Sequence, residues 1–178
     1  MIYRLDPDII GFPDPRDGDD DGLFAVGGDL SADRLLLAYQ NGIFPWYAYR
    51  REDNGFVDEN GEPWIQWWCP MKRFVIFPAE IHISHSMRTL LNKGRYMYSF
   101  NQAFDQVISY CGSLRSGQNG AWLGPHIVEA YTELHKLGFA VSVEVWDPAA
   151  PDGQEPYGQW YTNSDGKRLV GGLYGVVT

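Results

Sequence analysis

Apolar residues recur at helical spacing in four parts of the chain, and each part begins at a residue that favours the start of a helix. Ser31, Ser84 and Asn101 can accept hydrogen bonds from the free amides of a first helical turn, and Pro125 suits the first turn itself. Glycines that follow three of these parts favour helix ends. The pattern therefore predicts helices at 32–41, 85–91, 102–110 and 125–137.

Segments rich in β-branched and aromatic residues are typical of strands, and they cover residues 73–77, 96–100, 139–146 and 169–177. After the first helix, the order is strand, helix, strand, helix, helix and a pair of strands. This order predicts a mixed α/β fold with a largely antiparallel sheet at its end. A polar, glycine-rich segment at 50–63 is typical of a surface loop. We therefore expect a small N-terminal domain at 1–63 and a second domain at 64–178.

The composition, with 44% hydrophobic and 21% charged residues, is typical of a soluble globular protein. No apolar run approaches the roughly 20 residues of a membrane-spanning helix, and the N-terminus has charges where a signal peptide needs an apolar stretch. We therefore expect a cytoplasmic protein with no membrane partner. Cys69 and Cys111 are far apart, and His82 and His85 have no third ligand near them in sequence, so we expect no metal.

Charge is distributed unevenly along the chain, whose formal net charge is −9. Residues 72–115 hold six basic and two acidic residues, which gives +4, while the remainder holds eight basic and 21 acidic residues, which gives −13. A basic centre can bind RNA even in an acidic protein, although charge alone is equally consistent with an ordinary mixed surface.

Tryptophan is abundant, and four of the seven tryptophans lie in segments typical of loops: Trp46, Trp67, Trp68 and Trp122. Aromatic side chains in loops can stack on nucleobases at about 1–3 kcal/mol per base, but they also fill protein cores. Trp46 and Trp122, each close to glycine and proline, are the better candidates for binding. A carbohydrate-binding module is a rival interpretation, because exposed tryptophans also stack on sugars. The basic centre and the expected intracellular location favour RNA.

Patterns that define several large enzyme classes do not occur in this sequence. It has no P-loop, no dinucleotide-binding GxGxxG followed by an acidic residue, no GxSxG elbow and no HExxH helix. ATP hydrolysis, dinucleotide chemistry, serine hydrolysis and zinc proteolysis therefore lose support.

A set of longer motifs occurs in the order, and over nearly the whole length, in which it occurs in one protein family. The motifs are GLFAVGGDLS (22–31), LLLAYQNGIFPWY (35–47), WWCP (67–70), HISHSM (82–87), GAWLGPHIVEAYTELHKLGFA (120–140), SVEVW (142–146) and LVGGLYGV (169–176). By these motifs the chain resembles the leucyl/phenylalanyl-tRNA–protein transferases.

The resemblance implies a small N-terminal domain followed by a mixed sheet like that of the GNAT-type N-acetyltransferases. It also implies transfer of Leu or Phe from aminoacyl-tRNA to acceptor proteins whose first residue is Lys or Arg, which marks them for degradation. No cofactor or metal is implied, because the aminoacyl ester is already activated. Trp46 and Trp122 would stack on the terminal adenosine of the tRNA, and Phe44 and Leu173 would line the apolar pocket for the amino acid.

The family pattern continues beyond the GGLYGV strand, into a stretch that carries the residues thought to relay the proton. The resemblance therefore implies an acetyltransferase-like fold truncated at its C-terminal end, and it assigns no catalytic residue in this chain. We expect this chain alone to transfer no amino acid. The alternative is a non-catalytic fragment or remnant that binds aminoacyl-tRNA or peptide.

Overall fold

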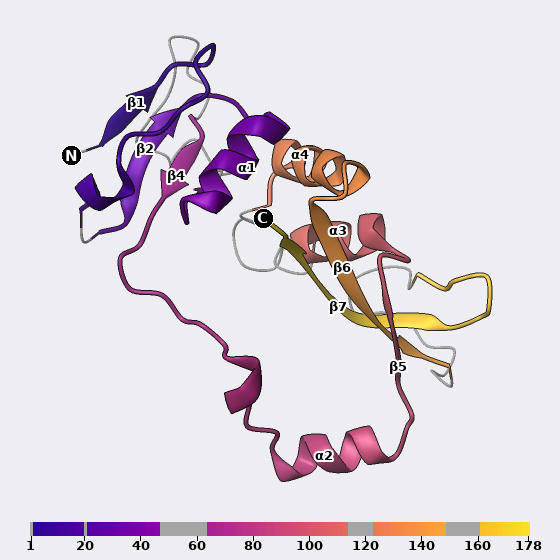
Figure 1. Ribbon diagram of the computed structural model, residues 1–178. Coiled ribbons are helices and arrows are strands. Elements are labelled where there is room, and N and C mark those ends of the chain that lie inside the picture. The colour runs from indigo at the N-terminus through magenta and orange to yellow at the C-terminus, as the bar shows by residue number, and fades with distance from the viewer. Residues whose placement is uncertain (1, 20, 47–63, 114–122, 149–160) are drawn as a thin grey trace.

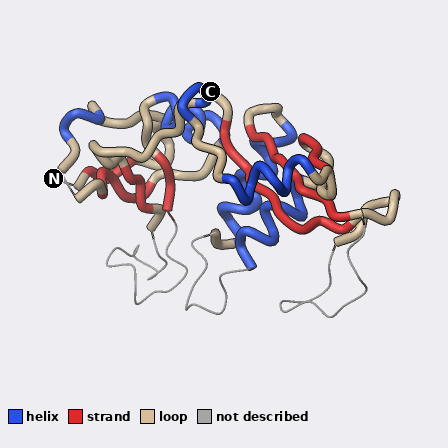
Figure 2. The backbone as a smooth tube through the Cα atoms, turned by 90° about the horizontal axis from the view of Figure 1, so that it is seen from below, coloured by secondary structure: helices blue, strands red, loops and turns tan. Residues whose placement is uncertain are grey.

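The computed structural model describes residues 2–19, 21–46, 64–113, 123–148 and 161–178 (Figure 1). In these parts the chain forms two separate β-sheets and four α-helices, which Figure 2 shows as two groups of strands accompanied by helices. The predicted mixed α/β class is confirmed. The predicted loop at 50–63 lies outside the described residues.

The first sheet holds four short strands: β1 (Tyr3–Leu5), β2 (Leu23–Gly27), β3 (Phe44–Trp46) and β4 (Gln66–Trp68). Their spatial order is β1-β2-β4-β3, with β1 parallel to β2 and β4 antiparallel to both β2 and β3. A short 3-10 helix, η1 (Pro15–Asp17), lies between β1 and β2. Helix α1 (Ala32–Gln40) connects β2 to β3. None of these strands was predicted, because in strands of three to five residues the alternation of apolar and polar side chains is too short to be recognised.

The second sheet holds β5 (Met97–Phe100), β6 (Ala140–Asp147) and β7 (Arg168–Val176), all antiparallel in the order β5-β6-β7. Helices α3 (Phe104–Ser113) and α4 (Pro125–Lys136) pack against one face of this sheet. Side chains alternate along β6, so Ala140, Ser142 and Glu144 are buried toward the helices while the residues between them are half-buried. The three predicted strands of this sheet and the helix at 125–137 are confirmed.

Two sequence-based predictions are wrong. Residues 73–77 form no strand and are exposed, because β-favouring side chains need a partner strand and none in the described chain pairs with them. Asn101 does not cap a helix, since α3 begins only at Phe104. Instead Asn101 adopts a φ of 56°, and its side-chain oxygen accepts a hydrogen bond from the amide of Ser142 at 2.8 Å.

A long exposed arm, residues 71–95, joins the first sheet to the second (Figure 1). It contains the 3-10 helix η2 (Pro78–Glu80) and the amphipathic helix α2 (His85–Asn92), which begins at the predicted cap Ser84. Every residue of the arm is exposed, and Phe74 is completely so. The arm therefore stands apart from the core of its own chain.

One hydrophobic core joins the two halves of the molecule. Leu35 and Ala38 of α1 pack in the same cluster as Ile127, Tyr131 and Leu134 of α4. Because these side chains are almost completely buried, the first sheet and the second sheet are held to each other through α1 and α4. No helix within the described ranges has both the length and the apolar character needed to cross a membrane.

Candidate functional site

Two of the predicted site residues, Phe44 and Trp46, lie on β3, directly after the turn that ends α1. Gly42 makes this turn with a φ of +69°, and the amide of Ile43 donates a hydrogen bond back to the carbonyl of Ala38. β3 then pairs with β4, which sets Phe44 opposite Trp68. Trp46 remains 44% exposed, as a stacking surface requires.

Leu173, the third predicted site residue, lies in the middle of β7 opposite Val143. Its neighbour Gly172 faces α3 so closely that a Cβ atom there would lie 2.8 Å from a methyl carbon of Val107. Because side chains alternate along a strand, Leu173 points away from α3 and is 60% exposed. The glycine before it therefore lets β7 pack on α3 while Leu173 remains available on the open face.

Three tyrosines connect the part of the chain that holds Phe44 to the part that holds Leu173. The hydroxyl groups of Tyr39 on α1 and Tyr131 on α4 form a hydrogen bond, and the Tyr131 ring meets the Tyr174 ring edge to face at 5.6 Å. Burial raises the pKa of all three phenols, so each hydroxyl stays neutral. The two sheets that carry the candidate residues are thereby linked through hydrogen-bonded and packed aromatic rings.

The fourth predicted residue, Trp122, lies outside the described residues, so its distance from Trp46 stays a prediction. Phe44 and Leu173 belong to different sheets.

A cavity of about 870 Å³ opens elsewhere, between the first sheet and the start of α4. Its lining combines apolar residues with polar ones, chiefly Arg4 of β1, Asp6 directly after it, and His126 and Glu129 of α4. Among the described residues, no three potential ligand side chains gather as a metal site.

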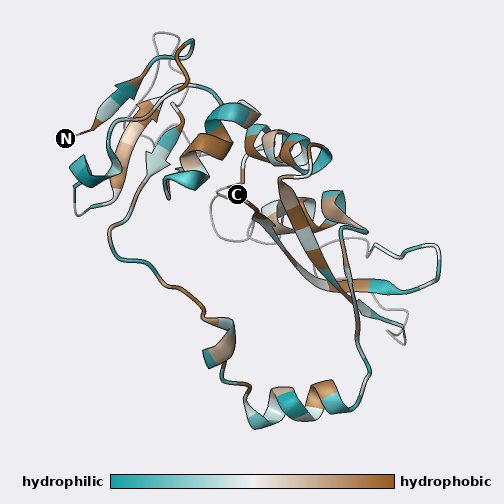
Figure 3. Cartoon of the chain, viewed as in Figure 1, coloured by the Kyte–Doolittle hydropathy of each residue, from teal (hydrophilic) through white to brown (hydrophobic). Residues whose placement is uncertain are grey.

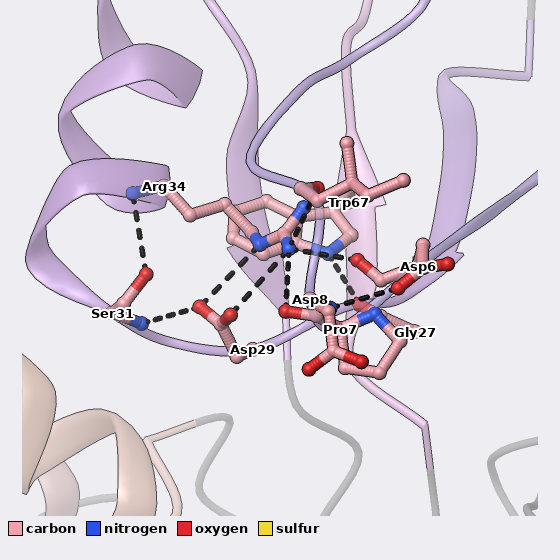
Figure 4. A network of polar contacts seen from close by, with 9 residues as sticks. Asp6, Pro7, Asp8, Gly27, Asp29, Ser31, Arg34 and Trp67 are labelled. Atoms are coloured by element: carbon pink, nitrogen blue, oxygen red, sulfur yellow. Dashed lines mark hydrogen bonds and ion pairs between the residues drawn. The ribbon is translucent and has the colours of Figure 1, made fainter.

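A buried guanidinium explains the GGDLS motif in physical terms (Figure 4). Arg34 is completely buried, and its Nη2 atom donates hydrogen bonds to the backbone carbonyls of Asp6, Pro7 and Ile9 at 2.8–3.2 Å. Gly28, with a φ of +70°, lies so close that a Cβ atom would be 3.1 Å from the Arg34 guanidinium carbon. Arg34 thereby fastens the segment after β1 to α1.

Two further residues of the same motif, Asp29 and Ser31, extend this network. Asp29 lies 3.4 Å from Arg34 Nε and accepts a hydrogen bond from the amide of Ser31, whose hydroxyl in turn caps α1. Burial opposes ionisation of Asp29, but hydrogen bonds from Ser31 and Arg34 hold the pKa of its carboxyl below the ordinary value. The sequence predicted the Ser31 cap, but Arg34 was not singled out, because its backbone partners lie 25–28 residues away.

A second buried ionisable group, Glu144, lies between β6 and the start of α3. Its carboxylate accepts hydrogen bonds from the hydroxyls of Ser99 and Ser142, each at 2.5 Å, and from the amide of Ala103 at 3.3 Å. Burial opposes its ionisation, yet these hydrogen bonds outweigh burial and hold the pKa of Glu144 below the ordinary value. With its oxygen atoms occupied in this way, Glu144 serves to join β5, β6 and α3.

Comparison with known proteins identifies the family to which these motifs belong. The pattern that defines the family “Leucyl/phenylalanyl-tRNA protein transferase” matches residues 75–154. The pattern for the N-terminal domain of the same family matches residues 28–71, which include the GDLS part of the GGDLS motif and β4.

Individual relatives agree with this match. Proteins named leucyl/phenylalanyl-tRNA–protein transferase from Flavobacterium psychrophilum, Anaeromyxobacter sp. strain Fw109-5 and Flavobacterium johnsoniae are 44%, 43% and 42% identical to this chain. The alignments include 94%, 98% and 98% of the chain. The chain belongs to the leucyl/phenylalanyl-tRNA–protein transferase family. It spans 62–68% of the length of these three relatives.

Proposed function

We propose that this chain is the part of an aminoacyltransferase that binds aminoacyl-tRNA, in an enzyme that moves Leu or Phe onto the N-terminal Lys or Arg of acceptor proteins. The family match over nearly the whole chain is the observation that carries this proposal. The modified acceptors would be marked for degradation in the cytoplasm.

The roles proposed for individual residues follow from the needs of that reaction. A terminal adenosine requires a flat, accessible aromatic surface, and Trp46 has one. We assign Trp122 to the same adenosine. An apolar side chain such as Leu or Phe requires a pocket lined by apolar groups, and Phe44 and the exposed Leu173 supply such groups from the two halves of the molecule.

The proposed transfer reaction requires little of the protein beyond positioning the aminoacyl ester and the acceptor amine. The acceptor amine has a pKa of about 7.7–8.0, so roughly a tenth to a sixth of it is already deprotonated at pH 7 and only modest help is needed to remove the proton from the rest. The aminoacyl ester is activated before it reaches the enzyme, and no cofactor is needed in the proposal. We assign no catalytic base in this chain.

The finer description of the fold is also a proposal. The antiparallel sheet β5-β6-β7 with α3 and α4 on one face is compatible with part of a GNAT-type acetyltransferase fold. We further propose two domains near the boundary expected at residues 63 and 64. Because β4 pairs within the first sheet, the structure favours a boundary after Trp68.

A chimaera tests the proposed function. Residues 1–178 of this chain would replace the matching part of the Flavobacterium johnsoniae relative, which is 42% identical over 176 residues. Incubated with radiolabelled Leu-tRNA and a peptide that begins with Arg, the chimaera should transfer label to the peptide. The matched control is the same peptide beginning with Ala, which should remain unlabelled.

The outcomes of this assay separate the proposal from its alternative. A folded chimaera that binds Leu-tRNA but labels no peptide would support a non-catalytic remnant. Product formed by the 178-residue chain on its own would contradict the expectation that it is inactive alone. A folded chimaera that neither binds Leu-tRNA nor forms product would refute the proposed function.

Binding of charged tRNA should depend on salt through the basic residues of the arm that make no ion pair within the described chain. Arg88 on α2 is exposed, whereas Arg95 is held by Asp147 at 2.6 Å. Arg88→Gln should therefore make the slope of log affinity against log salt concentration less negative. The slope should change by about 0.7–0.9 for each phosphate that the protein no longer neutralises. Filter binding of Leu-tRNA to this chain at several salt concentrations measures the slope.

Arg95→Gln is the matched control, because it removes the same charge from the same arm. It should lower the melting temperature, since it leaves the buried Asp147 without its guanidinium partner. Its effect on the salt slope should be smaller than that of Arg88→Gln. Equal slopes for wild type and Arg88→Gln would locate the RNA surface away from α2.

A further inference from the structure

The described lining of the cavity between the first sheet and α4 includes none of the residues assigned above to the adenosine or to the transferred amino acid. Its volume of about 870 Å³ is within the usual range for ligand sites. Its apolar surface comes chiefly from Leu30, Trp64 and Ile65, and Gly27 and Gly28 leave a wall of backbone. A concave site that combines apolar surface with a few polar side chains is the usual form of a ligand-binding site.

Two carboxyl groups accompany one guanidinium and one imidazole in the lining of this cavity. Helix α4 carries both hydrophilic and hydrophobic residues (Figure 3). Its residues His126 and Glu129 lie three positions apart, so both belong to the side of the helix that lines the cavity. Glu129 is exposed and forms no ion pair or hydrogen bond within the described chain. Its carboxylate is therefore available to a cation.

The second carboxyl group, that of Asp6, is held in position by its neighbours. The amide of Asp8 donates a hydrogen bond to Oδ1 of Asp6 at 2.8 Å. The backbone carbonyl of Asp6 accepts a hydrogen bond from the buried Arg34 at 2.8 Å. Asp29, 3.4 Å from Arg34 Nε, balances the charge of that guanidinium. The network around Arg34 thus fixes Asp6 at the cavity, with a carboxylate that can accept further hydrogen bonds through Oδ2.

Arg4 lies over the ring of Trp64, with its guanidinium carbon 4.7 Å from the ring centroid. Stacking uses the face of a guanidinium, so the N–H groups in its plane can still donate hydrogen bonds. An anionic ligand in this cavity would meet the carboxylates of Asp6 and Glu129. The lining therefore fits a ligand that carries a cation for the two carboxylates and neutral hydrogen-bond acceptors for Arg4.

The cavity also lies beside the strand that carries Trp46, the residue assigned to the adenosine. Trp46 pairs with Gln66 of β4, and Ile65, which lines the cavity, is the residue before Gln66. From the spacing within and between strands, the cavity wall at Ile65 begins within about 10 Å of the Trp46 backbone. A ligand in the cavity would therefore be close to an aminoacyl group on an adenosine stacked at Trp46.

We propose that this cavity receives the first residue of the acceptor protein. Asp6 and Glu129 pair with its Lys or Arg side chain, and Arg4 donates hydrogen bonds to the peptide carbonyls that follow. The methylene groups of the same side chain pack on Trp64 and Leu30. This assignment rests on the proposed transfer function and adds to it the place where the acceptor binds.

Fluorescence anisotropy of a peptide labelled at its C-terminal end tests the charge pairing. This chain should bind a peptide that begins with Arg about tenfold more tightly than the same peptide beginning with citrulline, which has a similar shape but no charge. Glu129→Gln should reduce this preference to about threefold, and the double change Asp6→Asn with Glu129→Gln should remove it. Glu129 is exposed, so the single change should leave the melting temperature unaltered.

Glu133→Gln is the matched control, because it removes the same charge from the same helix. Glu133 pairs with Lys136 at 3.4 Å and is not part of the cavity lining. Its replacement should preserve the preference for Arg over citrulline. Equal binding of the Arg and citrulline peptides by the natural chain would overturn the proposal, as would equal effects of Glu129→Gln and Glu133→Gln.

Photo-crosslinking shows where the peptide lies. A peptide with Arg first and benzoylphenylalanine second should crosslink to residues 4–7, 27–30, 64–65 and 126–130, which include the cavity lining. An excess of the plain Arg peptide should suppress these crosslinks. Crosslinks confined to other parts of the chain would overturn the proposal. Tighter binding of a short RNA ending in CCA by Glu129→Gln, with peptide binding unchanged, would show that the cavity takes a nucleotide instead.

The chimaera separates the acceptor site from the proposed function. In the chimaera, Glu129→Gln should raise the KM for the Arg peptide by about threefold and leave the KM for Leu-tRNA unchanged. If the chimaera transfers Leu and Glu129→Gln has no effect on the KM for the peptide, the acceptor site is wrong and the proposed function stands. A folded chimaera that forms no product, although the chain binds the Arg peptide in the cavity, would refute the transfer function and retain the peptide site.

Discussion

Replacing Arg34 with methionine is expected to lower the free energy of unfolding by about 3–5 kcal/mol. Methionine preserves much of the buried volume but donates no hydrogen bond. The change would leave the carbonyls of Asp6, Pro7 and Ile9 without their guanidinium donor, and would remove the buried partner of Asp29. Because a domain of this size has about 5–15 kcal/mol of total stability, the loss is large. Urea unfolding followed by tryptophan fluorescence measures it.

Arg16→Met is the matched control for the same chemical change on the surface. Arg16 also pairs with an aspartate, Asp14, but its side chain is 86% exposed. Exposed ion pairs contribute little to stability, so the unfolding curve of Arg16→Met should superimpose on that of the natural chain. Equal curves for Arg34→Met and Arg16→Met would mean that water satisfies the exposed carbonyls and that Arg34 does not fasten the segment after β1.

Local signals in the sequence were sufficient for most helices. Ser31 and Ser84 were predicted to cap α1 and α2, and each side chain accepts the expected amide hydrogen bond. These interactions connect residues three positions apart, so the sequence around each cap contains all the information that is needed. The same reasoning failed at Asn101, because the partner of its side chain is Ser142, which lies 41 residues away.

Interactions between distant segments explain the other errors. Residues 73–77 have strand-forming side chains but no neighbouring strand within the described ranges, so propensity alone gave the wrong answer. Conversely, β1 and β4 are too short to be recognised, and they are strands because β2 pairs with both of them. An arginine on the apolar side of α1 is itself a signal in the sequence that Arg34 has a buried partner.

The candidate site shows the same division between local and distant information. The sequence indicated Phe44, Trp46 and Leu173 through family motifs, and the structure gives each a defined strand position. The sequence could not indicate how the two halves of the molecule are joined. The contacts among Tyr39, Tyr131 and Tyr174 form only where α1, α4 and β7 meet in the folded chain. The hydrogen bond between the hydroxyls of Tyr39 and Tyr131 joins α1 to α4, and the contact between the rings of Tyr131 and Tyr174 joins α4 to β7.

Glu144→Gln is expected to lower the free energy of unfolding by about 1.5–3 kcal/mol at pH 7. Glutamine has the same shape but no charge, and the amide nitrogen that takes the place of the oxygen facing Ser99 cannot accept the hydrogen bond that Ser99 donates. The weaker contacts would loosen β5 from β6 and leave the start of α3 less well anchored at Ala103. Urea unfolding at a series of pH values measures both the loss and its dependence on pH.

The pH dependence distinguishes an effect of the charge on Glu144 from the loss of a hydrogen-bond acceptor. Because the pKa of Glu144 is lower in the folded chain than its ordinary value of 4.5, its ionised form stabilises the fold above that pH. This stabilisation disappears as the pH falls through the lower folded pKa, so the gap between the natural chain and Glu144→Gln should narrow below about pH 4.5. Glu129→Gln, the same change at an exposed position of α4, should follow the natural chain at every pH. A gap for Glu144→Gln that stays constant down to about pH 3 would mean that the hydrogen bond lost at Ser99, and not the charge, makes the carboxylate necessary.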